Sequence, residues 1–136
     1  MPLYEKYVGR SRDDFATLED LQKNYKVTVG DDFNYSYDVV DEIARQTPDK
    51  LAMLWVSNEG VERRFTFGDI SRWSAKTANY LESLGIQRGD RVMVVLKRHY
   101  QFWFVITALH KMGAVIIPAT NLLMEHDFDY RFKAAG

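Results

Sequence analysis

The stretch "RVMVVLKRHYQFWFVITALHKMGAVIIPAT", Arg91–Thr120, decides the fold. Its first part, Arg91–Leu96, is rich in valine and too short for a helix, which is typical of a strand covered on both faces and makes it a candidate central strand. The next part, His99–Met112, is apolar at helical spacing, and Gly113 ends it. A second apolar run follows at Ala114–Ile117, which a proline ends. Strand, helix and strand in this order predict a right-handed parallel βαβ unit.

The flanking sequence predicts a β-hairpin and further helices. "LAMLWVS" and "VERRFTF" are typical of two strands joined by a turn at Asn58-Glu59-Gly60, where glycine tolerates positive φ. Thr66 and Asp69 form an approximate capping box for the helix that comes next. Apolar residues recur at helical spacing in four segments: 11–25, 35–47, 66–84 and 124–136. The predicted fold class is α/β, a partial parallel sheet with a βαβ unit, a β-hairpin and N-terminal helices.

The same spacing assigns a buried face to two of these helices. In the second segment that face contains Tyr37, Val40, Ile43 and Ala44. In the third it contains Ile70, Trp73, Thr77, Leu81 and Leu84.

Composition limits the partners and the compartment. The 136 residues carry 18 Lys and Arg against 19 Asp and Glu, a net charge of −1 with no blocks of one sign, so nucleic acid and anionic membranes are not expected as partners. The longest apolar run, Phe102–Leu109, is too short to span a bilayer. The sequence has no cysteine and opens with a polar segment unlike a secretory signal, so we expect a cytoplasmic protein.

No residue pattern in the chain predicts an active site. The eight glycines form neither G-x-G-x-x-G nor G-x-x-x-x-G-K-[ST], so no phosphate-binding loop is expected. Three histidines lack metal-ligand spacing: His99, His110 and His126. Lys97-Arg98-His99 follows the first predicted strand of the βαβ unit, where ligands of open α/β sheets collect, but it is also typical of a solvated loop. Three helix carboxylates are interpreted as a solvent-exposed polar face: Asp38, Asp41 and Glu42.

Two hypotheses remain open on the residues alone. The chain is either a non-catalytic α/β binding or interaction module, or the front part of a larger enzyme whose reactive loops follow Gly136. A βαβα order calls for a neighbouring strand at the open edge, which favours the second hypothesis.

Three motifs, in this order, resemble the opening of the AMP-forming acyl-CoA synthetases. "FTFGDI" at Phe65–Ile70 is similar to the first core motif of that adenylate-forming family, and "GDRVMV" at Gly89–Val94 is similar to the strand that follows. "LHKMGAVIIPAT" at Leu109–Thr120 is similar to the second core motif. The likeness covers about Phe33–Gly136 and is greatest to the medium-chain branch. It implies an N-terminal helical extension at 1–32 and the first part of the AMP-binding N-terminal domain at 33–136.

The resemblance also implies a reaction and its ligands. A complete enzyme of this family joins a small carboxylic acid to CoA with Mg-ATP, through an acyl-adenylate. The ATP-phosphate loop, the adenine site and the catalytic lysine of the family lie after the end of this chain, so the fragment alone is predicted to be inactive and to bind ATP weakly. In relatives the loop after the second core motif approaches the nucleotide part of CoA, and here it is Thr120, Asn121 and Leu122.

Self-association is a further expectation. The helix at His99–Met112 is apolar around most of its circumference, and the strand edge beside it is unpaired. We expect a two-fold dimer that buries Phe102, Trp103, Phe104 or the edge of the strand at Ala114–Ile117, with exchange of the terminal helix as a further alternative.

Overall fold

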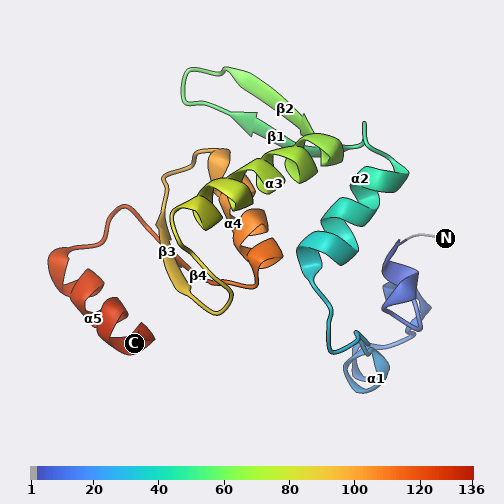
Figure 1. The fold of residues 1–136 in the computed structure, drawn as a ribbon. Coiled ribbons are helices and arrows are strands. Elements are labelled where there is room, and N and C mark those ends of the chain that lie inside the picture. Colours follow the sequence, from blue (N-terminus) through green and yellow to red (C-terminus); the bar gives the residue numbers. More distant parts are fainter. Residues whose placement is uncertain (1–2) are drawn as a thin grey trace. The chain divides into compact units, whose positions relative to one another are not determined.

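A computed structural model describes residues 3–136 of the chain (Figure 1), which fall into two compact units, one ending at Phe33 and the other covering Asn34–Gly136. Each unit is described by itself.

The first unit contains two 3-10 turns and one short α-helix. They are η1 (Leu3–Lys6), η2 (Arg12–Asp14) and α1 (Leu18–Asn24). The single helix expected over residues 11–25 is therefore wrong. Phe15 is extended, with φ −102° and ψ 123°, and Thr17 starts a new helix by accepting a 3.1 Å hydrogen bond from the Asp20 N–H. Two caps, at Ser11 and at Thr17, thus divide the segment into two short elements.

The second unit begins with a π-helical turn that runs into a helix. The turn is η3 (Ser36–Asp41) and the helix is α2 (Glu42–Gln46). The helical prediction is confirmed, but its buried face is only partly right. Val40 is buried as expected, whereas Tyr37 is half exposed and Ser36 is completely buried, its hydroxyl donating to the Thr107 carbonyl at 2.9 Å. The wider π turn changes the angular position of each residue, so a period of 3.6 misassigns the face.

The predicted hairpin and the helix after it are confirmed. Strands β1 (Leu51–Val56) and β2 (Glu62–Thr66) pair antiparallel, with Gly60 in the turn at φ +78°. Helix α3 (Phe67–Ser83) starts at the capping box of Thr66 and Asp69. The buried face of α3 differs from the expected one: Ile70 and Ser74 are buried, while Trp73 and Leu84 are exposed.

The βαβ unit is also confirmed. Strand β3 (Arg91–Val95), helix α4 (Gln101–Met112) and strand β4 (Val115–Ala119) follow in order, and β3 pairs parallel with β4. Gly113 ends α4 at φ +69°, a conformation that glycine adopts without strain. Within residues 3–136 the only strand paired with β3 is β4, so β3 is an edge strand here and not a central one. Pro118 does not end β4 but lies inside it.

The last element is helix α5 (Glu125–Ala135), which confirms the expected terminal helix. It has no buried residue.

Two hydrophobic clusters meet on α4. The aromatic cluster has Val40, Ile70 and Phe104 at its centre, with partly buried side chains around it: Ala52, Met53, Phe65, Phe67 and Tyr100. The aliphatic cluster has Val94, Leu109 and Ala114 at its centre, with these side chains around it: Leu81, Ile86, Val92, Leu96, Phe102, Val105, Met112 and Ile116.

The clusters correct the surface that was expected to self-associate. Phe104 is 6% exposed because it fills the aromatic cluster, and Phe102 packs against the aliphatic cluster. Of the three side chains expected in a dimer contact, Trp103 alone is exposed.

Candidate functional site

The parallel pairing of β3 and β4 brings the two predicted candidate loops to one edge of the sheet. Val95 is paired with Ala119, and each is the last residue of its strand. The loop with Lys97-Arg98-His99 leaves β3 there, and the loop Thr120–Leu122 leaves β4. This is the carboxyl edge, where open α/β sheets bind ligands.

The β1–β2 hairpin holds the loop after β3 in place. The Trp55 indole N–H donates to the Arg98 carbonyl at 2.7 Å, and the Trp55 ring meets the Tyr100 ring edge-on at 5.4 Å. The Arg63 guanidinium lies 5.3 Å from the centre of the Tyr100 ring and donates to its hydroxyl at 3.3 Å. Arg63 is thereby a fourth basic side chain near this edge, and no pattern in the sequence predicted its place there.

The loop after β4 has exposed polar groups. Thr120, Asn121 and Leu122 are all exposed, and the Leu122 N–H donates to the Thr120 hydroxyl oxygen at 3.2 Å. Phosphate oxygens accept hydrogen bonds from hydroxyl, amide and cationic donors. This loop provides hydroxyl and amide donors, and the neighbouring loop provides the cations.

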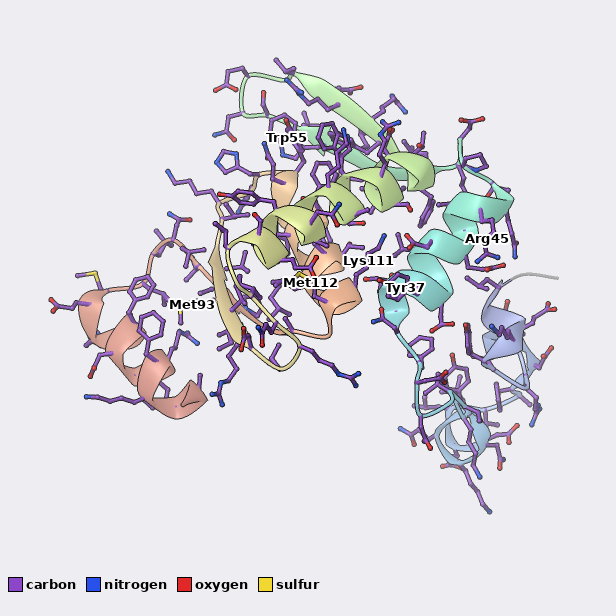
Figure 2. The ribbon with its side chains drawn as sticks, in the orientation of Figure 1. Tyr37, Arg45, Trp55, Met93, Lys111 and Met112 are labelled. Carbon is purple, nitrogen blue, oxygen red and sulfur yellow. The ribbon has the colours of Figure 1, made fainter. Side chains whose placement is uncertain are left out.

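A groove of about 810 Å³ lies at the opposite, amino-terminal end of the sheet. Its lining includes Tyr37 and Asp41 from η3, Glu82 from α3, Arg88 from the turn before β3, and Lys111 from α4. Figure 2 shows Tyr37, Lys111 and Met112 beside one another at this place.

A nearly buried ion pair forms one wall of the groove. The Lys111 ammonium donates to an Asp41 carboxylate oxygen at 2.9 Å and to the Ser71 carbonyl at 3.3 Å, and the Lys111 side chain is only 6% exposed. The ammonium is 5.7 Å from the centre of the Tyr37 ring. These contacts join η3, α3 and α4, so the pair acts as a structural clamp whose charges already neutralise each other. A lysine in the last turn of an otherwise apolar helix was the only sequence signal for it.

The three helix carboxylates do not form one polar face. Asp41 pairs with Lys111, Glu42 pairs with Arg45, and Asp38 accepts a hydrogen bond from the Asn34 N–H at 2.7 Å. The interpretation of Asp41 as a solvent-exposed group is wrong, because its partner comes from a helix 70 residues further along the chain.

The three histidines lie apart. The His110 carbonyl accepts a hydrogen bond from the Asn34 amide at 2.7 Å, His126 lies 3.5 Å from Asp127, and His99 is exposed in the loop after β3. Over residues 3–136 the His, Asp and Glu side chains form no cluster of three or more that could hold a metal ion. Across the same part of the chain, no helix has the length and apolar character needed to cross a bilayer.

Comparison with known proteins identifies the fold and the family. Residues 40–136 match the family described as AMP-binding enzyme. The chain belongs to that family. It is 32% identical to the mitochondrial acyl-coenzyme A synthetase ACSM3 of Mus musculus, over 98% of this chain and 24% of the relative, and 38% identical to mitochondrial ACSM5 of Homo sapiens, over 76% of this chain and 19% of the relative.

A solved structure has a similar fold. The N-terminal subdomain of Klebsiella oxytoca NpsA superposes with a TM-score of 0.65 at 26% identity, covering 73% of this chain and 25% of the subdomain. The chain therefore spans about a quarter of the proteins it matches.

The expected cytoplasmic location is contradicted by these relatives, which are named mitochondrial. A lack of cysteine indicated a reducing compartment, but it cannot distinguish one reducing compartment from another.

Proposed function

We propose that this chain is the first part of the N-terminal domain of an AMP-forming acyl-CoA synthetase. Residues 1–32 are the N-terminal helical extension of that enzyme, and residues 33–136 begin its AMP-binding domain. The observation that carries the proposal is the family match over residues 40–136 together with 32% identity to ACSM3 along nearly the whole chain.

The proposed reaction has two displacements. A carboxylate oxygen attacks the α-phosphorus of Mg-ATP, the bond to the β-phosphate oxygen breaks, and acyl-adenylate and pyrophosphate form. The CoA thiolate then attacks the acyl carbonyl, the bond from the carbonyl carbon to the AMP oxygen breaks, and acyl-CoA and AMP leave. Both steps require cations and fixed donors at the phosphoryl oxygens.

The role of this part of the enzyme is to provide a scaffold. It has no glycine-rich loop for the ATP phosphates. ATP and Mg²⁺ are therefore assigned to the remainder of the enzyme, and the chain alone is predicted to be inactive. The medium-chain relatives support a small or medium-chain carboxylic acid as substrate, and their names support a mitochondrial location.

The loop Thr120, Asn121 and Leu122 is proposed to face CoA. Its exposed hydroxyl and amide, and the cations of Lys97 and Arg98 that follow the neighbouring strand, suit the phosphates of a nucleotide. We also propose that the isolated chain self-associates through the exposed Trp103, and light scattering after size-exclusion chromatography tests this.

A chimera tests the function. In human ACSM5 the segment that this chain matches is replaced by the chain, and acyl-CoA formation from octanoate, ATP and CoA is measured. The expected result is activity that depends on all three substrates, with none from the chain alone. A folded chimera without activity would overturn the proposal.

The CoA loop is tested in the same chimera with the double substitution Thr120→Ala and Asn121→Ala. We expect KM for CoA to rise about tenfold while adenylate formation, measured by pyrophosphate exchange, is unchanged, because only the second displacement uses CoA. Glu59→Ala at the tip of the hairpin is the control. An unchanged KM for CoA would refute the assignment.

A further inference from the structure

The basic side chains of the loop after β3 have no partner in the described part of the chain. Lys97, Arg98 and His99 are all exposed, and within residues 3–136 none of their side chains makes a hydrogen bond or an ion pair. Cations elsewhere in the same unit do pair with carboxylates: Arg45 with Glu42, Arg64 with Glu62, Arg72 with Asp69, Lys111 with Asp41 and Lys133 with Asp129. An anion that reaches the loop after β3 therefore meets positive charges that no described residue neutralises.

The backbone of this loop is nevertheless held at two points. The chain bends at Arg98, and the Arg98 carbonyl accepts the 2.7 Å hydrogen bond from the Trp55 indole. Two residues later, the Tyr100 ring packs in the aromatic cluster against Phe65 and Phe104. The loop thus combines a fixed backbone with unpaired cationic side chains, an arrangement that lowers the entropy lost when a ligand binds.

Arg63 adds a cation from the hairpin. Trp55 and Arg63 are paired across β1 and β2, so their side chains lie on the same face of the hairpin, and both contact Tyr100. The Arg63 guanidinium donates one hydrogen bond to the Tyr100 hydroxyl, and a guanidinium has five N–H donors. Its remaining donors are available to an acceptor from solution.

The start of α4 adds to the attraction for anions. Its first turn contains no acidic residue, and the N-terminal end of a helix has a partial positive charge. A phosphate monoester carries about two negative charges near neutral pH and has three acceptor oxygens. CoA has one such group, the 3′-phosphate of its ribose, whereas each phosphate of its diphosphate carries a single charge. The cations of the loop and the hairpin match the more highly charged group.

We propose that Lys97, Arg98 and Arg63 bind the 3′-phosphate of CoA, and that Trp55 is the positioning residue that holds the loop in place for it. This inference rests on the proposed function, in which the neighbouring loop Thr120–Leu122 faces CoA. It goes beyond that function by assigning to the loop after β3 and to the hairpin the discrimination of CoA from dephospho-CoA, which lacks the 3′-phosphate.

A nucleotide titration tests the site in this chain by itself. The isotope-labelled chain is titrated with adenosine 3′,5′-bisphosphate, which corresponds to the nucleotide end of CoA, and with AMP, which lacks the 3′-phosphate. Binding is followed by NMR through the backbone N–H signals of Arg98 and His99, with Gly85 at the opposite end of the sheet as the reference. We expect a Kd of the order of 1 mM for the bisphosphate and binding about tenfold weaker for AMP.

Three substitutions separate the roles of the side chains. Trp55→Phe keeps an aromatic ring beside Tyr100 but removes the indole donor, and it should raise the Kd for the bisphosphate about fivefold while the Kd for AMP is unchanged. Arg63→Ala should raise the Kd for the bisphosphate about tenfold. Arg64→Ala is the matched control, because it removes the same charge from the adjacent residue, whose side chain lies on the other face of β2 and pairs with Glu62.

Other results overturn the inference. Equal Kd values for the bisphosphate and AMP would reject the assignment to the 3′-phosphate, and equal effects of Arg63→Ala and Arg64→Ala would mean unspecific attraction by charge. A Trp55→Phe variant that binds the bisphosphate as before, or that loses both ligands equally, would refute the positioning role.

The ACSM5 chimera separates this inference from the proposed function. In an active chimera, KM for dephospho-CoA should be about tenfold higher than KM for CoA, and Lys97→Ala with Arg98→Ala should bring the ratio close to one. An active chimera with a ratio of one before substitution rejects the phosphate site and keeps the proposed function. An inactive chimera, with selective binding of the bisphosphate by the chain, keeps the phosphate site and rejects the proposed function.

Discussion

The two ends of α4 lie in different surroundings. Near its start, Phe104 is enclosed by residues of η3, the hairpin and α3, all within one unit of the chain. Near its end, Leu109 is completely buried, but the sheet it packs on has Val95 and Val115 exposed. The first part of this core is enclosed by neighbouring elements, whereas the second part packs on a two-stranded sheet that keeps two apolar side chains exposed. Substitutions at the two ends should therefore have unequal effects.

The largest effect is expected at the enclosed end. Phe104→Ala removes a ring that contacts Phe65, Trp73 and Tyr100, and it should lower the free energy of unfolding of the isolated chain by about 3–5 kcal/mol. Urea unfolding followed by circular dichroism measures this. Gln101→Ala at the exposed start of the same helix is the control, with an expected loss below about 1 kcal/mol. Equal losses would mean that the aromatic cluster is not a packed core.

A smaller loss is expected at the end that packs on the sheet. Leu109→Ala should cost about 2–4 kcal/mol, because a sheet of only two strands can shift and fill part of the cavity. The same urea series measures it. A loss greater than that of Phe104→Ala would reverse the comparison.

The ion pair of Lys111 and Asp41, in the last turn of α4, should contribute less. Lys111→Met keeps the apolar stem but leaves the Asp41 carboxylate, which is 24% exposed, without its partner. We expect a loss of about 1–3 kcal/mol, reduced by the solvent that Asp41 retains. Lys50→Met is the matched control, since Lys50 is exposed just before β1 and the change should stay within about 0.5 kcal/mol. Thermal unfolding that ranks the two variants equally would argue against the clamp.

The smallest effect concerns the junction of hairpin and helix. Thr66→Ala removes the hydroxyl that accepts from the Asp69 N–H at 3.1 Å, with an expected loss of about 1 kcal/mol. Thr66→Ser keeps the cap and should restore stability to within about 0.5 kcal/mol. If serine fails to restore it, the effect comes from the methyl group and not from the cap.

The sequence predicts the βαβ unit, the hairpin and the start of α3 because their signals are local. Gly113, Gly60 and the Thr66 capping box each fix one boundary. The sequence also predicts that the two loops meet at the carboxyl edge of the sheet, because neighbouring parallel strands place their carboxyl ends at the same edge. The position of Arg63 at that edge could not be predicted from the sequence, because only the packing of the hairpin brings it there.

The errors have physical causes too. Ser11 and Thr17 each cap the start of a short helical element, and a pattern of apolar spacing cannot detect the break between the two elements. The π turn in η3 buries Ser36 where a regular helix would bury Tyr37. The pair of Asp41 and Lys111 joins residues too distant in the chain for any local pattern to connect.

Pro118 has a consequence for how this sheet can grow. The Val115 N–H donates to the Asp90 carbonyl, so alternate residues of β4 turn their N–H groups toward β3 and the residues between them turn outward. Pro118 is one of the outward residues and has no N–H, so a strand that pairs with the outer edge of β4 lacks a donor near the carboxyl end of that edge. Along the outer edge of β3 the corresponding residues are Arg91, Met93 and Val95, and all have donors. Strand addition is thus directed to one side of the sheet, and the other side is protected against unintended pairing with a foreign strand.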